Sequence, residues 1–378
     1  MTTVPLRTIG REWLRMGVIG FGGPPAHIAL LRKLCVNERE WLTAEEFEHA
    51  VATTGLLPGP ASTQLAIYCA WRLRGVRGAL LGGLCFIVPG LIMIIALSAL
   101  FFAQRPAAWL QGAALGAGAV VPAIALTTGA TMIPPSVRNV RTDKRRLTRW
   151  VLYATVGAVV AMVASAYVVI ALIAAGVVEI LARRGTANGT MAMAVTAAKA
   201  GGLGVLGSIA WLAFKVGALS YGGGFVIIPL MQHDVVSVYH WMSGPQFLNA
   251  VALGQITPGP VVLTTAAVGY AARGIAGALL ATVVAFGPSF IFILAGGSSF
   301  ERLRTNPTVQ AFFAGAGPCV IGAIAGATVP LALLLSHLWQ VPLLVAATGW
   351  LWWKRGSSMI PLLGAAVLGA ALSHVLPL

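Results

Sequence analysis

Apolar stretches long enough to cross a lipid bilayer recur along this chain. Stretches 79–102, 109–133 and 311–335 are examples. Inside a bilayer every backbone polar group must find its partner within the protein, so such stretches fold as helices or as closed barrels. The chain of 378 residues is 58% hydrophobic and only 9% charged, values far from those of a soluble domain. We expect an all-α polytopic protein whose surroundings are the lipid bilayer.

The formal net charge of +15 arises mainly from Lys and Arg in short loops between apolar stretches, where such residues set helix orientation. No basic stripe with interleaved aromatic residues indicates nucleic-acid binding, and no GxxxxGK[ST] loop indicates ATP coupling. The cysteines lack CxxC or Cys/His spacing, so we expect neither a metal site nor a cofactor. They are Cys35, Cys69, Cys85 and Cys319.

An internal repeat appears when the sequence is shifted by 200 residues, which aligns 17–70 with 217–270 without a gap. Identical pairs include Gly22 with Gly222, Gly23 with Gly223, Trp41 with Trp241, Phe47 with Phe247, and Pro58-Gly59-Pro60 with Pro258-Gly259-Pro260. At an offset of 199, Gly116-Ala117-Gly118 matches Gly315-Ala316-Gly317. We infer a tandem duplication, with the first repeat in 1–185 and the second in 186–378.

Equivalent loops of the two repeats differ in basic charge. Loop 138–149 is rich in Lys and Arg, whereas 331–342 has none. The positive-inside rule therefore places equivalent loops on opposite sides and predicts an inverted topology. That inversion requires an extra crossing within 187–219. A single helix over 151–182 would be about 48 Å long, too long for a bilayer, so we expect two short helices that turn near Ser165.

Glycine and proline clusters interrupt apolar segments at corresponding places in the two repeats. The first pair is Phe21-Gly22-Gly23-Pro24-Pro25 with Tyr221-Gly222-Gly223-Gly224, and the second is Leu57-Pro58-Gly59-Pro60 with Thr257-Pro258-Gly259-Pro260. Broken or re-entrant helices at matching positions of inverted repeats are typical of transporter binding sites. One such cluster alone would favour a simple packing kink, but four in register favour a site.

The Pro-Gly-Pro breaks predict an anion site. Pro60 and Pro260 suit the first position of a helix, which would leave free the next amides, those of residues 61–63 and 261–263. Free amides and the positive end of the helix dipole attract anions. Side-chain donors nearby are Ser62, Thr63, Gln64, Thr264 and Thr265.

Two titratable residues are candidates for proton coupling. His27 lies one helical turn after the first glycine break, and an ionisable group at membrane depth suggests function. The alternative is a neutral histidine bonded to a freed carbonyl. Asp234 follows the glycine cluster of the second repeat; its alternative is an interfacial cap. Most other carboxylates lie on polar connectors and offer no catalytic constellation, so we do not expect an enzyme.

Several strings resemble the two repeats of the chromate ion transporter family: FGGPPAHIALLR, EREWLTAEEF, LLPGPASTQLAI and WRLRGVRGALLGG, then KVGALSYGGGFVIIPL, QITPGPVV and GYAARGIAGALLAT. The resemblance covers nearly the whole chain and implies efflux of chromate, a tetrahedral dianion like sulfate, across the bacterial inner membrane. It places the transport path at Gly22, Gly23, Pro24, His27, Pro58, Gly59, Pro60, Thr63 and Gln64. The second repeat departs from this pattern with Gly224, Ile227 and Thr264, so we expect the halves to work unequally.

Two alternatives of the same fold stay open at this stage. A passive anion channel would share the chemistry of the helix ends, and a carrier of sulfate or another oxyanion would share the whole site. A homodimer is also left open.

Overall fold

The computed structural model is built of helices, and the part of the chain that it describes contains no strand. Described are residues 4–103, 107–138, 140–184, 204–220, 227–296, 305–354 and 358–373. The first repeat contains α1 (Leu6–Ile19), α2 (Gly23–Arg32), η1 (Lys33–Glu38), α3 (Ala44–Leu56), α4 (Ala61–Phe101), α5 (Ala108–Val137), α6 (Lys144–Val163), η2 (Ser165–Tyr167) and α7 (Val168–Arg184). The second contains α8 (Val205–Leu219), α9 (Ile227–Gln232), η3 (His233–Val238), α10 (Gly244–Ile256), η4 (Val261–Leu263), α11 (Thr264–Gly296), α13 (Pro307–Gly326), α14 (Thr328–Ala332), α15 (Gln340–Lys354) and α16 (Met359–Leu372).

Six of the described helical segments are long and apolar enough to cross a bilayer. Two of them, in α4 and α11, expose apolar side chains at intervals of four residues, with one interval of eight across Gly287 in α11, which is the spacing of one helix face. On α4 these are Val76, Leu80, Leu84, Val88 and Ile92; on α11 they are Ile275, Leu279, Val283 and Ile291. An apolar face of this extent suits lipid rather than water, so the chain is a multi-pass membrane protein.

The expected turn near Ser165 is confirmed, because α6 ends at Val163 and α7 begins at Val168 after the short η2. The extra crossing predicted in 187–219 falls partly outside the described residues, and only α8 of that segment is described. The inverted orientation of the two repeats remains a prediction.

Both long helices α4 and α11 contain a sharp reversal close to their start. Gly75 and Gly274 have φ of 58° and 61°, a left-handed conformation that glycine adopts readily. A Cβ at Gly78 would lie 2.3 Å from the carbonyl oxygen of Ala70, so the segments on either side of the turn pack back to back. The segment 61–73 is therefore a separate helix of about 20 Å, shorter than the roughly 30 Å hydrocarbon core.

Capping boxes begin the helices that lead into the Pro-Gly-Pro breaks. In α3 the Glu46 amide donates to Thr43 Oγ1 at 3.1 Å, and the Thr43 amide donates to Glu46 Oε2 at 2.9 Å. In α10 the same exchange joins Ser243 and Gln246. Each box satisfies two amides that the first helical turn cannot, and so fixes where these helices start.

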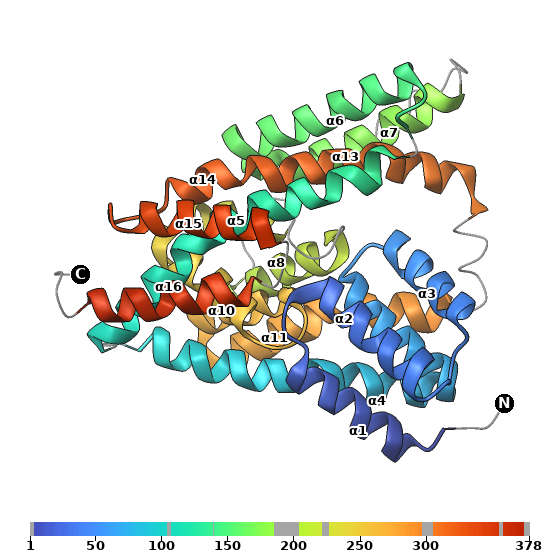
Figure 1. The fold of residues 1–378 in the computed structure, drawn as a ribbon, viewed down its shortest axis with the longest axis horizontal. Coiled ribbons are helices and arrows are strands. Elements are labelled where there is room, and N and C mark those ends of the chain that lie inside the picture. The colour runs from blue at the N-terminus through green and yellow to red at the C-terminus, as the bar shows by residue number, and fades with distance from the viewer. Residues whose placement is uncertain are drawn as a thin grey trace.

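The two repeats are intertwined. Helix α13 of the second repeat packs against α6 and α7 of the first, while α5 of the first packs against α15 and α16 of the second. Figure 1 shows this exchange, with α13 in orange beside the green α6 and α7. The boundary between 1–185 and 186–378 therefore divides the sequence, whereas the packing crosses it.

Candidate functional site

Each described Pro-Gly-Pro segment separates two helices, as the sequence predicts. Helix α3 ends at Leu56 and α4 begins at Ala61; α10 ends at Ile256 and η4 begins at Val261. Gly59 has φ of 124° and Gly259 has φ of 99°, values that favour glycine. The backbone at both breaks thus depends on the glycine.

The position predicted for the two prolines is wrong by one residue. Pro60 lies at the N-cap with ψ of 96°, and its carbonyl accepts from the amides of Thr63 at 2.9 Å and Gln64 at 3.0 Å. Likewise the amide of Leu263 donates to the Pro260 carbonyl at 2.9 Å. An N-cap carbonyl takes the first intrahelical bonds, so the amides left without an intrahelical acceptor are those of residues 61–62 and 261–262, and not those of 63 and 263.

The break of each repeat is hydrogen-bonded to the other repeat. The Gly59 amide donates to the carbonyl of Ser220, the residue after α8, at 3.0 Å. The Gly259 amide donates to the carbonyl of Gly20, the residue after α1, at 2.8 Å. These bonds join equivalent atoms, because Gly20 aligns with Ser220 and Gly59 with Gly259. The breaks therefore meet across an internal pseudo-two-fold relation.

Four residues at or next to the break of the first repeat have buried polar side chains: Thr63 and Gln64 in the first turn of α4, Ser220, whose carbonyl accepts from Gly59, and Ser289. An ideal Cβ on Gly59 would lie 2.5 Å from Gln64 Nε2 and 3.2 Å from Ser289 Oγ, so these two groups flank the glycine. Within the described part of the chain, Thr63 Oγ1, Ser220 Oγ, Ser289 Oγ and Gln64 Oε1 have no hydrogen-bond partner. Unpaired buried polar atoms are costly, and their concentration here indicates a site for a polar ligand.

The break of the second repeat lacks this cluster. The hydroxyl of Thr264 donates to the Val261 carbonyl at 2.8 Å, and that of Thr265 donates to the Val262 carbonyl at 2.7 Å. Both hydroxyl protons are thus used within the first helical turn, beside the buried apolar side chains of Val261 and Val262. Among the described residues, the unpaired hydroxyl groups of Thr63, Ser220 and Ser289 belong to the first break, whereas the unpaired donor beside the second break is the amide group of Gln255.

His27 links the first glycine break to the first Pro-Gly-Pro break. Its Nε2 lies 2.9 Å from the Gly20 carbonyl, and its Nδ1 lies 3.1 Å from Ser62 Oγ. A carbonyl only accepts, so Nε2 carries the proton, and in the neutral ring Nδ1 accepts from the Ser62 hydroxyl. The Gly20 carbonyl accepts from both His27 and Gly259, which makes it a junction between the repeats.

The other predicted residues take separate places. Gly22 and Gly23 have φ of 98° and 74°; Gly22 is the N-cap of α2, Gly23 is its first residue and Pro24 its second. A Cβ at Gly23 would lie 3.8 Å from Val261, which brings this break against the second repeat. Gly222, Gly223 and Gly224 lie outside the described residues. Asp234 forms an ion pair with Lys215 of α8.

Sequence reasoning missed Gly20, Ser220, Ser289 and Lys215. The repeat alignment offered a signal for two of them. Ser289 aligns with Gly90 and Ser220 with Gly20, so in each case the second repeat carries a polar side chain where the first repeat has glycine. Lys215 was recognisable as a cation within an otherwise apolar helix.

Helices long enough to span a bilayer, with breaks in both repeats around a buried polar centre, are typical of membrane transporters. A protein-family model described as "Chromate transporter" matches residues 7–180 and 207–370. The chain belongs to the chromate transporter family.

Curated relatives are similar over almost their whole length. The chromate transport protein of Cupriavidus metallidurans is 31% identical, over 97% of this chain and 93% of the relative. The probable chromate transport protein of Synechococcus elongatus is 27% identical, over 96% of this chain and 95% of the relative. An uncharacterized transporter of Methanocaldococcus jannaschii is 25% identical, over 95% and 92% respectively. No solved structure matches this chain significantly.

Proposed function

We propose that this protein is a secondary transporter that exports chromate across the bacterial inner membrane, driven by the proton gradient. Family membership and the names of the relatives support chromate as the cargo. The observation that carries the proposal furthest is the buried hydroxyl cluster at the break of the first repeat. Thr63, Ser220 and Ser289 offer donors to an oxyanion where the described residues offer them no partner.

The donor set fits weak binding of a tetrahedral oxyanion. The hydroxyl groups and the amides of residues 61 and 62 all donate, and the end of a partly buried helix contributes up to about 2 kcal/mol for an anion. These contributions offset only part of the cost of desolvating a dianion. Weak binding suits a carrier, which must release its cargo. Gln64 Nε2 donates to the Pro58 carbonyl at 2.7 Å, so the free atom of this side chain is Oε1, a buried acceptor that suits a water or a protonated oxyanion.

The His27–Ser62 pair provides a route for proton coupling. In neutral His27 the Ser62 hydroxyl donates to Nδ1. When Nδ1 gains a proton it donates to Ser62 Oγ instead, and the Ser62 hydroxyl becomes a donor for the anion. Protonation thus changes the charge and the hydrogen-bond donors next to the site, so the binding of a proton and the binding of an oxyanion are linked. Because the proton gradient is directed inward, it drives export only if the carrier takes up a proton outside after it has released the oxyanion there.

Flux measurements on two hydroxyl variants test the site. Thr63→Val and Ser289→Ala each remove one donor, so we expect the apparent KM for chromate to rise about five- to tenfold, the equivalent of about one hydrogen bond. The control is Thr282→Val, since that buried hydroxyl donates to the Ala278 carbonyl within α11. Chromate uptake into inverted vesicles containing matched amounts of protein gives the kinetics. A KM equal to that of the control in both variants would place the site elsewhere.

The same vesicles distinguish a transporter from a passive channel. A coupled transporter accumulates chromate above equilibrium when a proton gradient is imposed, whereas a channel cannot. Sulfate and molybdate added as competitors identify the preferred oxyanion. Flux that is indifferent to the gradient would assign the protein as a channel.

His27→Gln tests the coupling route. Glutamine keeps a polar side chain but cannot titrate, so we expect transport to lose its dependence on pH between about 5 and 8. Membrane insertion should be unchanged, as measured by the amount of protein in washed membranes. An unaltered pH profile would reduce His27 to a structural link between Gly20 and Ser62.

A further inference from the structure

A cavity of about 590 Å³ lies where the two repeats exchange helices. Its walls come from α5, α6, α7 and α13, and one residue of α3, Gly55, borders it. Water in the liquid occupies roughly 30 Å³ per molecule, so the cavity has room for a hydrated anion. The hydroxyl cluster described above does not line it, and the cavity therefore needs its own explanation.

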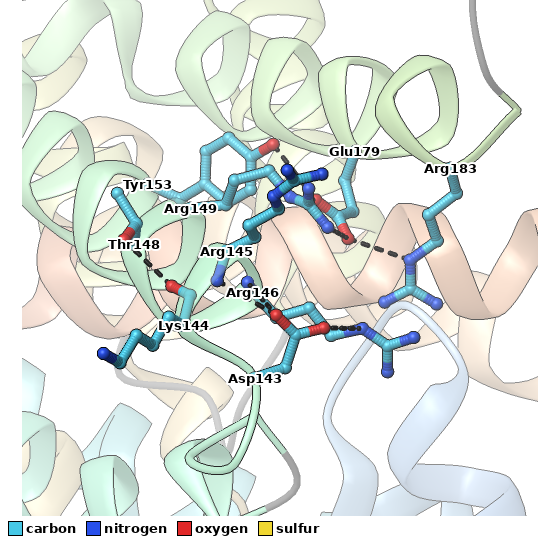
Figure 2. A network of polar contacts seen from close by, with 9 residues as sticks. All are labelled: Asp143, Lys144, Arg145, Arg146, Thr148, Arg149, Tyr153, Glu179 and Arg183. Carbon is cyan, nitrogen blue, oxygen red and sulfur yellow. Dashed lines mark hydrogen bonds and ion pairs between the residues drawn. The ribbon is translucent and has the colours of Figure 1, made fainter.

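Two arginines, Arg146 of α6 and Arg183 of α7, line this cavity. Arg183 contacts Glu179 through Nε at 2.8 Å, and Arg146 contacts Asp143 through Nε at 3.2 Å. Figure 2 shows the terminal nitrogens of both guanidinium groups turned away from these carboxylates and toward the same side of the network. Those nitrogens are the ones suited to bind an oxyanion in the cavity.

The surroundings of the cavity carry excess positive charge. The network in Figure 2 contains the basic residues Lys144, Arg145, Arg146, Arg149 and Arg183 against the acids Asp143 and Glu179, five cations to two carboxylates. Glu179 is already bound by Arg149, Arg183 and the Tyr153 hydroxyl. The remaining positive potential concentrates anions in the cavity.

One border of the cavity lies at α3, the helix that ends at the first Pro-Gly-Pro break. Gly55 belongs to the last turn of α3, four residues before Gly59, and a Cβ placed on it would meet nothing within 4 Å. The open space of the cavity thus reaches the helix that ends at the proposed binding site. The arginines stand on the side that the positive-inside rule assigns to the cytoplasm.

We propose that this cavity is an anion vestibule in which Arg146 and Arg183 hold a tetrahedral oxyanion before it passes to the Pro-Gly-Pro site. The inference rests on the proposed export of chromate for its role, but the binding of an oxyanion is independent of transport. A free anion and the phosphate of a lipid headgroup share this chemistry, so the experiment must distinguish them.

The binding test uses a cysteine-free variant into which Val140→Cys is introduced, because Val140 lines the cavity. Sulfate or chromate should slow the reaction of this cysteine with a maleimide in detergent, while chloride at equal ionic strength should not. Adding Arg146→Gln should abolish the protection, and Arg145→Gln, which changes an adjacent residue outside the lining, should retain it. Equal labelling rates with sulfate and chloride would overturn the proposal. Protection that needs no sulfate but requires phosphatidylglycerol vesicles would overturn the free anion in favour of a headgroup.

The transport test uses two pairs of variants in inverted vesicles. Arg146→Gln should raise the apparent KM for chromate about three- to tenfold at low salt, with a smaller effect at high salt, relative to Arg145→Gln. Gly55→Phe should fill the part of the cavity beside α3 and reduce flux strongly, while Gly55→Ala should not. If the Thr63→Val and Ser289→Ala variants transport normally and protection of the cysteine persists, the proposed binding site fails but the vestibule stands. If Gly55→Phe and Arg146→Gln both match their controls, the vestibule is not on the transport route and the proposal fails.

Discussion

At the scale of single residues, the two central glycines have equivalent backbones but different neighbours. Gly59 faces Gln64 and Ser289, whereas the nearest atom to a Cβ on Gly259 would be Leu263 Cδ1 at 3.5 Å. A side chain at position 59 would therefore enter the polar cluster, and one at 259 would meet only ordinary contacts. Both copies of the Pro-Gly-Pro motif need a glycine with positive φ, but the first copy has polar side chains as neighbours and the second does not.

Comparison of Gly59→Ala with Gly259→Ala separates these contributions. Both substitutions impose a left-handed conformation on alanine, at a cost of about 1–2 kcal/mol. Only Gly59→Ala also displaces Gln64 and Ser289, so we expect it to abolish chromate flux while Gly259→Ala retains part of it. Equal loss in both variants would show that the backbone conformation matters and the polar cluster does not. Vesicle flux normalised to protein amount provides the measurement.

At the scale of elements, small residues let helices from different repeats approach closely. A Cβ on Gly369 of α16 would lie 2.1 Å from the carbonyl oxygen of Gly112 in α5, and one on Gly116 would lie 2.0 Å from that of Ala365. The helices α6 and α13 meet in the same way at Gly157 and Gly322. Since lipid provides no hydrophobic drive for association, this close packing holds the helices together.

Gly369→Leu tests the contact between α5 and α16. The side chain cannot fit against the backbone of α5, so we expect destabilisation of at least about 1–3 kcal/mol and a lower apparent melting temperature in detergent. Gly364→Leu is the matched control on the same helix, because a Cβ there meets nothing within 4 Å. A melting temperature for Gly369→Leu equal to that of the control would show that α16 is free to separate from α5.

At the scale of the whole molecule, each repeat contacts the other both at its Pro-Gly-Pro break and through helices that pack against the other repeat. The Gly59–Ser220 and Gly259–Gly20 hydrogen bonds join the two repeats at their breaks. Helix α5 of the first repeat packs against helices of the second, and α13 of the second packs against helices of the first. Neither repeat alone supplies the three unpaired hydroxyl groups, because Ser220 and Ser289 come from the second repeat and Thr63 from the first. An inverted arrangement would let such a centre open alternately to the two sides.

Cysteine labelling tests the inverted orientation. In a cysteine-free background, Thr142→Cys should react with a membrane-impermeant maleimide only from the cytoplasmic side, because its loop is rich in Arg and Lys. Leu338→Cys should react only from outside; Leu338 is 91% exposed and lies in the corresponding uncharged loop. Labelling of both positions from the same side would show that the repeats run in parallel orientation.

The sequence by itself determined the features that depend on local chemistry. Hydropathy predicted which stretches form membrane-spanning helices. The internal repeat showed which positions of the two halves are equivalent, and the proline and glycine clusters predicted where the helices break. The sequence also indicated the turn near Ser165, because a helix through 151–182 would exceed the bilayer. These properties need no knowledge of which segments touch, since each follows from neighbours along the chain.

Only the tertiary structure decided which of the marked residues form one site. Thr63 and Thr264 belong to equivalent breaks, yet the first hydroxyl is unpaired among the described residues and the second bonds its own helix. Ser220 and Ser289 join the first break from the other repeat, and no local pattern announces contacts between residues so far apart. The physical reason is that a hydroxyl group's role depends on which acceptors and donors surround it. In this protein those surroundings come from the exchange between the two repeats.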